Sequence, residues 1–201
     1  MANRILVWDV PTRVFHWLLA ASFVGVFVTG DSEKWRDVHV ALGYIMLALI
    51  AFRFVWGFVG TRYARFSSFT FSPAKVVAYL KSLLSRSPEH YVGHNPAGSW
   101  VIYGLLSLGL LSGATGYAVY SEIGGEWLEE MHELAANGML ALVVVHIAGV
   151  LVSSLLHREN LARSMISGYK KGAGAQGIRR SHWMIGTGLL AGAIALWSGI
   201  I

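Results

Sequence analysis

The 201-residue chain contains no cysteine, and only 13% of its residues are charged. Without cysteine it can form neither a disulfide nor an iron–sulfur cluster, and it lacks the attachment site of covalently bound c-type haem. A soluble domain carries roughly 25% charged residues, so this chain has too little charge to cover a globular surface. Because 55% of its residues are hydrophobic, we expect one integral membrane domain without a separate soluble domain.

Five apolar segments are long enough to cross a bilayer as helices, which takes roughly 20 residues each. These segments are residues 13–30, 38–59, 98–119, 132–156 and 183–201. The expected fold class is therefore all-α: an integral membrane helical bundle with a four-helix core and a fifth, C-terminal helix. The alternative for the last segment is a hydrophobic tail that lies at the membrane interface.

Lysine and arginine fall mainly on one side of this alternating topology. That side holds Arg4, Arg13, Arg62, Arg65, Lys75, Lys81, Arg86, Arg158, Arg163, Lys170, Lys171, Arg179 and Arg180. The other side has an acidic segment with Glu122, Glu126, Glu129 and Glu130. Since basic residues gather on the cytoplasmic side, we expect a cytoplasmic N-terminus. The positive net charge follows the topology and does not indicate nucleic-acid binding.

Four histidines lie in or at the ends of these apolar segments, where a polar group is costly and needs a specific reason. His132 and His146 are fourteen residues apart, which is about 21 Å along a helix and nearly four full turns, so they share one face. His16 lies equally far before Gly30, at the outer end of the first helix, and His39 opens the second helix from outside. The depths predict an outer pair, His39 with His132, and an inner pair, His16 with His146.

Arg53 is the only charged residue in the middle of an expected span, fourteen residues after His39 and therefore at the inner level. An unpaired guanidinium there costs several kcal/mol, so it needs an anionic partner or contact with water. A haem propionate would serve, because arginine binds carboxylates in a bidentate manner. Gly43 follows His39 by one turn, where a missing side chain lets a flat ring approach the backbone.

This pattern predicts two non-covalently bound haem b groups, each with two axial histidines. Three alternatives remain: hydrogen-bonded histidines that only pack, a zinc or copper site, and a proton relay. A metal site would need three or four ligands that converge on one point, and a relay would lack a carboxylate in the middle of a span. We assign no ligand role to the other histidines, which are His90, His94, His157 and His182.

Several segments resemble the bacterial cytochrome b561 family, which includes the cytochrome b subunits of nickel–iron hydrogenases and a small superoxide-oxidising cytochrome. They are VWDVPTRVFHW (7–17), VHVALGYIMLALIAFRFVWGFVG (38–60), GHNPAG (93–98), EMHELAANGMLALVVVHIAGV (130–150) and HREN (157–160). The resemblance implies a four-helix bundle whose first, second and fourth helices supply the haem ligands, here His16, His39, His132 and His146. We accordingly divide the chain into a di-haem transmembrane domain, residues 1–171, and a cytoplasmic linker with a fifth helix, residues 172–201.

The family also implies electron exchange between membrane quinone and a redox partner outside, in the inner membrane of a bacterium. The acidic outer segment favours a basic partner, so we rank a periplasmic c-type cytochrome first. Anchoring of a hydrogenase ranks second and oxidation of superoxide, an anion, ranks third. From a different class, we keep a haem-free transporter for metal ions or protons.

Overall fold

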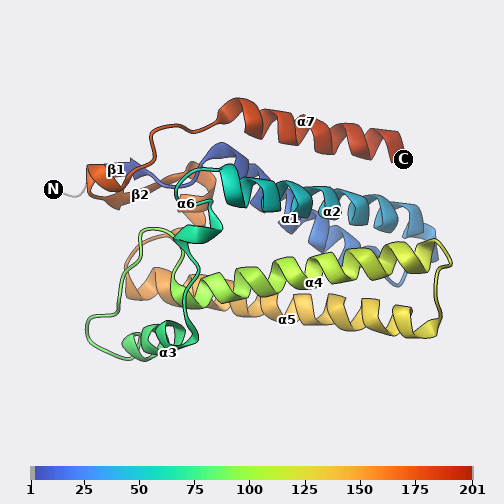
Figure 1. Ribbon diagram of the computed structural model, residues 1–201, viewed down its shortest axis with the longest axis horizontal. Helices are drawn as coiled ribbons and strands as arrows, with labels where there is room; N and C mark the ends of the chain where they lie inside the picture. Colours follow the sequence, from blue (N-terminus) through green and yellow to red (C-terminus); the bar gives the residue numbers. More distant parts are fainter. Residues whose placement is uncertain (1–2, 201) are drawn as a thin grey trace.

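The computed structural model describes residues 3–200, and five long helices dominate it (Figure 1). They are α1 (Val10–Thr29), α2 (Arg36–Val59), α4 (Pro96–Tyr120), α5 (Glu126–Leu156) and α7 (Trp183–Ile200). All five are long and apolar enough to cross a membrane, and a 3-10 turn at Glu33–Trp35 extends α2 at its N-terminal end. The expected all-α membrane bundle with a fifth C-terminal helix is confirmed, and the chain is a multi-pass membrane protein. Ile201, the last residue of the expected fifth segment, lies outside the described residues.

Local sequence explains where α1 and α4 begin. The Asp9 side chain accepts a hydrogen bond from the Thr12 N–H at 2.8 Å, and the Asn95 side chain accepts one from the Gly98 N–H at 2.7 Å. Each cap is followed by a proline in the first turn of the helix, where the missing N–H of proline removes no helical hydrogen bond. Both helices therefore start a few residues before the apolar segments that predicted them.

Helix α5 begins at Glu126, six residues before the expected start at His132. Its first turn contains Glu126 and Glu129, whose negative charges are favourable near the positive N-terminal end of the helix dipole. The apolar pattern alone does not include this polar first turn. As a consequence, His132 lies within α5 rather than at its start.

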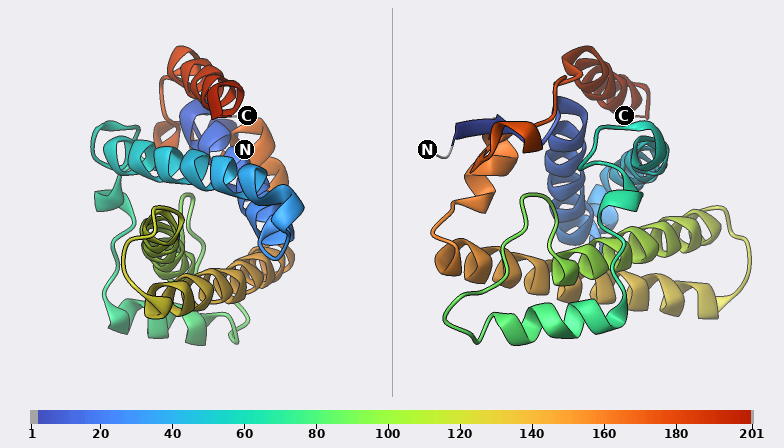
Figure 2. Two further views of the ribbon diagram at one scale, coloured as in Figure 1. Left: turned by 90° about the vertical axis from the view of Figure 1, so that its right-hand side faces the viewer. Right: turned by 60° about the vertical axis from the view of Figure 1, so that its left-hand side comes forward.

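The long helices form two pairs, α1 with α2 and α4 with α5, joined mainly where α2 packs on α4. Helix α7 packs on α1 and α2, on the side away from α4 and α5 (Figure 2). Although α5 lies close along α4, its backbone makes no extensive contact with α1 or α2. The four-helix core thus leaves α5 set apart from the two helices that carry His16 and His39.

One end of the bundle is capped by short elements, namely β1 (Asn3–Leu6), β2 (Tyr169–Gly172), α3 (Pro73–Ser82), α6 (Leu161–Ser167) and 3-10 turns at Phe66–Ser68 and Gly174–Gln176. Strands β1 and β2 pair antiparallel, with Asn3 opposite Gly172 and Leu6 opposite Tyr169. We call this the basic end, and the opposite end, with the 121–125 turn, the acidic end. The C-terminus of α7 reaches the acidic end (Figure 1).

Candidate functional site

The structure brings the four histidines together as two pairs along the bundle. The rings of His39 on α2 and His132 on α5 have their centres 6.2 Å apart, with an angle of 73° between their planes. The rings of His16 on α1 and His146 on α5 have their centres 6.4 Å apart, at 50°. All four residues are only half-buried.

The ring spacings fit an iron ion between each pair. An imidazole nitrogen binds a transition metal at about 2.0 Å, and two such bonds in line place the ring centres about 6.3 Å apart. Two imidazoles in direct packing contact would have no reason to keep this distance at both levels. The donor set also suits haem, whose iron accepts two axial nitrogen ligands.

Backbone hydrogen bonds orient the rings of the outer pair. Nδ1 of His39 donates to the Val26 carbonyl at 2.9 Å, and Nδ1 of His132 donates to the Ser112 carbonyl at 2.8 Å. Because a carbonyl can only accept, Nδ1 carries the proton and Nε2 keeps its lone pair free for a metal. In the inner pair, Nδ1 of His16 is buried and has no hydrogen-bond partner within residues 3–200.

A buried apolar layer separates the two pairs. Phe23, Met46 and Met139 form one cluster, and each is seven residues from a histidine on its own helix, about 10 Å along the axis. Each of the three exposes 7% or less of its surface. This layer keeps water and polar groups out of the middle of the bundle and makes the two levels distinct sites.

Two glycines differ in what their missing side chains allow. A Cβ on Gly43 would meet no atom within 4 Å, so open space lies beside α2 one turn after His39. A Cβ on Gly116 of α4 would lie 2.9 Å from Cε1 of His132, closer than Cβ atoms normally approach. Gly43 is recognisable from its position one turn after His39, whereas Gly116 is not, because α4 is rich in glycine and its register against α5 is a tertiary property.

Arg53 is deeply buried near the inner level, with 3% of its surface exposed. Its guanidinium lies over the rings of Phe66 and Phe69, at 4.8 and 5.7 Å from their centres. Its Nη1 has no hydrogen-bond partner in the described part of the chain, and neither ion pair found there involves Arg53. A buried cation with a free donor suits an anionic group, as expected for a propionate.

His94 is a site residue to which the sequence pattern assigns no role. Its ring lies against Trp8 and Phe69, with centres 4.8 and 4.4 Å apart, and its buried Nδ1 has no partner among residues 3–200. Burial, together with the nearby charges of Arg53, the inner histidines and Lys170, lowers the pKa of His94 to about 3. The ring is therefore neutral, and it stands close to Arg53 and the inner histidines. The motif GHNPAG could have indicated this position, since the Asn95 cap fixes the residue before it.

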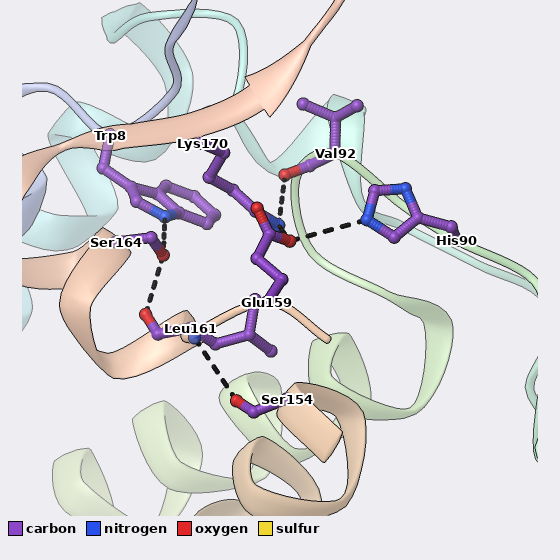
Figure 3. Close-up of polar contacts among 8 residues, drawn as sticks. All are labelled: Trp8, His90, Val92, Ser154, Glu159, Leu161, Ser164 and Lys170. Carbon is purple, nitrogen blue, oxygen red and sulfur yellow. Dashed lines mark hydrogen bonds and ion pairs between the residues drawn. The ribbon is translucent and has the colours of Figure 1, made fainter. Parts of the chain in front are cut away.

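A polar cluster at the basic end holds the loop that carries His94 (Figure 3). Lys170 on β2 forms an ion pair with Glu159 at 3.0 Å and donates to the Val92 carbonyl at 3.0 Å. His90 lies 3.5 Å from the same Glu159 oxygen. The Lys170 side chain is almost fully buried, so this attachment of residues 90–94 to β2 and the end of α5 is a fixed part of the fold.

The geometry gives no support to a convergent site for zinc or copper. Among residues 3–200, no group of three or more His, Asp or Glu side chains could hold a metal ion. The histidines instead meet in twos, at two levels. This favours haem iron, whose four remaining ligands come from the porphyrin.

Comparison with known proteins identifies the family. The family model described as "Prokaryotic cytochrome b561" matches residues 7–168. Proteins that carry the name "Probable Ni/Fe-hydrogenase B-type cytochrome subunit" are similar, from Rhizobium leguminosarum bv. viciae (28% identity, 83% of this chain and 88% of the relative) and Azotobacter vinelandii (25%, 84% and 89%). A "Probable Ni/Fe-hydrogenase 1 B-type cytochrome subunit" of Escherichia coli strain K12 is 22% identical, over 82% of this chain and 89% of the relative. No solved structure matches significantly. The chain therefore belongs to the prokaryotic cytochrome b561 family, and it is a membrane cytochrome of the b type, a class that carries haem b in electron transport.

Proposed function

We propose that this protein conducts electrons across a bacterial inner membrane, between quinone in the bilayer and a redox protein outside, through two bound haem b groups. The observation that supports this most is the presence of two histidine pairs, with ring centres 6.2 and 6.4 Å apart, at two levels of one bundle. Two iron sites stacked along the membrane normal divide the distance across the bilayer into two shorter transfers.

Each predicted residue then has a task. His39 and His132 would be the axial ligands of the outer site, and His16 and His146 those of the inner site. When bound, the haems supply one-electron carriers at the two depths. Gly43 leaves room for a flat ring beside α2.

Arg53 would hold a propionate at the inner level and place a fixed positive charge near that iron. Positive charge stabilises the reduced form of a haem, because reduction adds an electron, so Arg53 raises the potential of the inner site. Its burial strengthens this effect, since a charge screened by water would act weakly.

The orientation that we propose places the basic end in the cytoplasm, following the distribution of lysine and arginine. The inner pair would then lie toward the cytoplasm and the outer pair toward the periplasm. Quinone would reach the bundle from the lipid.

For the outside partner we propose a c-type cytochrome. The first turns of α5 expose Glu126, Glu129 and Glu130, six or fewer residues from His132, and Trp127 beside them is 61% exposed. An acidic surface with an exposed aromatic ring near the outer site suits a soluble redox protein with a basic face. The same charges would repel superoxide, which therefore remains a weaker candidate.

A hydrogenase is the second candidate partner, and the names of the relatives favour it. Against it, the alignment with the Rhizobium protein spans 213 residues, more than the 201 of this chain, so that relative carries inserted segments that this chain lacks. Such segments could contribute to contacts with catalytic subunits.

Purified protein tests this proposal. We expect two haems per chain, reduction by quinol, and reoxidation by a c-type cytochrome at a rate that falls as salt rises. Charge reversal of Glu126, Glu129 and Glu130 to lysine should slow reoxidation without changing haem content. A colourless, folded preparation would exclude the proposed function. Failure with c-type cytochromes, together with co-purifying hydrogenase subunits, would favour the second candidate.

A further inference from the structure

We propose that His94 joins Arg53 to hold a carboxylate of the haem at the inner histidine pair, with His94 as a neutral hydrogen-bond donor. This rests on the proposed function, because it requires a haem between His16 and His146. It assigns a positioning role to a loop residue that lies outside every membrane-spanning helix.

Both side chains pack on the same aromatic ring. The centre of the Phe69 ring lies 4.4 Å from that of His94 and 5.7 Å from the guanidinium carbon of Arg53. Phe69 is almost completely buried, with 1% of its surface exposed, and therefore acts as a rigid wall. The imidazole and the guanidinium are thus fixed near one another, although 41 positions separate them in the sequence.

Both side chains also carry a polar nitrogen that is buried without a partner within residues 3–200, Nη1 of Arg53 and Nδ1 of His94. A buried donor without an acceptor costs about 1–3 kcal/mol, so two of them in one place point to a missing acceptor. Asp9, an acidic side chain whose charge acts on Arg53, is already bonded to Thr12, Trp56 and Thr61. Since neither nitrogen has an acceptor among residues 3–200, the missing acceptor is a group that binds to the protein.

The chemistry of the two donors defines the missing group. A guanidinium offers paired donors to a carboxylate, and a neutral imidazole offers one further N–H. The missing group is not a cation, because Arg53 already places a positive charge there. Near the inner histidines, the carboxylate of a haem side chain meets these requirements.

The loop that carries His94 is anchored on both sides. Lys170 binds the Val92 carbonyl on one side, and Asn95 caps α4 on the other. Anchoring of this kind limits the entropy lost when His94 meets its partner. Through Lys170, this anchoring also connects strand β2 to the inner site.

His94→Leu and His94→Gln test the proposal, with Ser87→Leu, a substitution of an exposed residue of the same loop, as the control. We expect His94→Leu to keep two haems per chain, to lower the midpoint potential of the inner haem only, and to shift its propionate band in the resonance Raman spectrum. His94→Gln retains an N–H donor and should stay near the wild type. Ser87→Leu should show no change, and neither should the outer haem in any variant.

Two results would overturn the proposal. One is an unchanged inner potential and propionate band in His94→Leu. The other is an equal disturbance in His94→Gln and His94→Leu, which would mean that His94 only fills space between Trp8 and Phe69. Failure of the proposed function would look different, because His16→Ala would then leave the haem content unchanged, and both proposals would fall.

Discussion

Gly116 of α4 and His132 of α5 are in closer contact than any larger residue at position 116 would allow, because a Cβ there would lie 2.9 Å from the imidazole. Gly116→Val should therefore push the ring of His132 away from its present position, at a cost of about 1–3 kcal/mol in stability. We expect loss of the outer haem, so that haem per chain falls toward half.

Gly188→Val is the control for this substitution, since a Cβ on Gly188 of α7 meets nothing within 4 Å. It should keep the full haem content. The two variants can be compared by the absorbance of the reduced pyridine complex per mole of protein. Equal haem content in both would mean that the position of His132 does not matter for binding.

Asp9 connects the start of α1 to the end of α2. Its carboxylate accepts hydrogen bonds from the Thr12 N–H, from Trp56 Nε1 at 3.1 Å and from the Thr61 hydroxyl at 2.6 Å. Asp9→Ala removes a helix cap and leaves buried donors unpaired, so the free energy of unfolding should fall by about 2–4 kcal/mol. Asp9→Asn keeps an acceptor and should cost less. Unfolding of the detergent-solubilised protein measures both, and a loss below that of the exposed control Asp31→Ala would contradict the assignment.

The contribution of the Lys170–Glu159 ion pair to stability can be measured with a single and a double variant. Lys170→Met leaves the Glu159 carboxylate without its partner in a poorly solvated position, and we expect a loss of about 3–5 kcal/mol. Adding Glu159→Leu removes the unpaired charge, so the double variant should be more stable than Lys170→Met alone. If adding Glu159→Leu does not raise the stability of Lys170→Met, the ion pair does not stabilise the basic end.

Arg53→Leu should lower the midpoint potential of the inner haem and leave that of the outer haem unchanged, because only the inner site loses a nearby positive charge. Arg53→Lys keeps the charge but not the paired donors, so its inner-haem potential should lie between those of the wild type and Arg53→Leu. A redox titration followed at the haem absorbance resolves both components. A shift of the outer component alone would mean that Arg53 acts at the other level.

Much of this site follows from the sequence because depth in a membrane is readable from position along a helix. Helix rise alone relates His132 to His146 and His39 to Arg53, without knowledge of how the helices pack. The same rule could not find Gly116, whose importance depends on the register of α4 against α5.

Other features depend on contacts between distant segments. The strands NRIL and YKKG are four residues long and are stable only as a pair. Neither segment therefore has a sequence pattern that predicts a strand by itself. His94 gains its surroundings from Trp8 and Phe69, which approach it only in the folded chain. The early start of α5 was missed because its first turn is acidic rather than apolar.

The most direct test of the account is the haem content of three proteins: the wild type, His132→Ala and His16→Ala. We predict two haems per chain in the wild type and about one in each variant, with the outer haem lost in the first and the inner haem lost in the second, since ligand loss is local while the bundle remains folded. Redox titration tells the two remaining haems apart by their potentials. A wild type with one haem, or variants that keep both, would contradict the two-level arrangement of ligands.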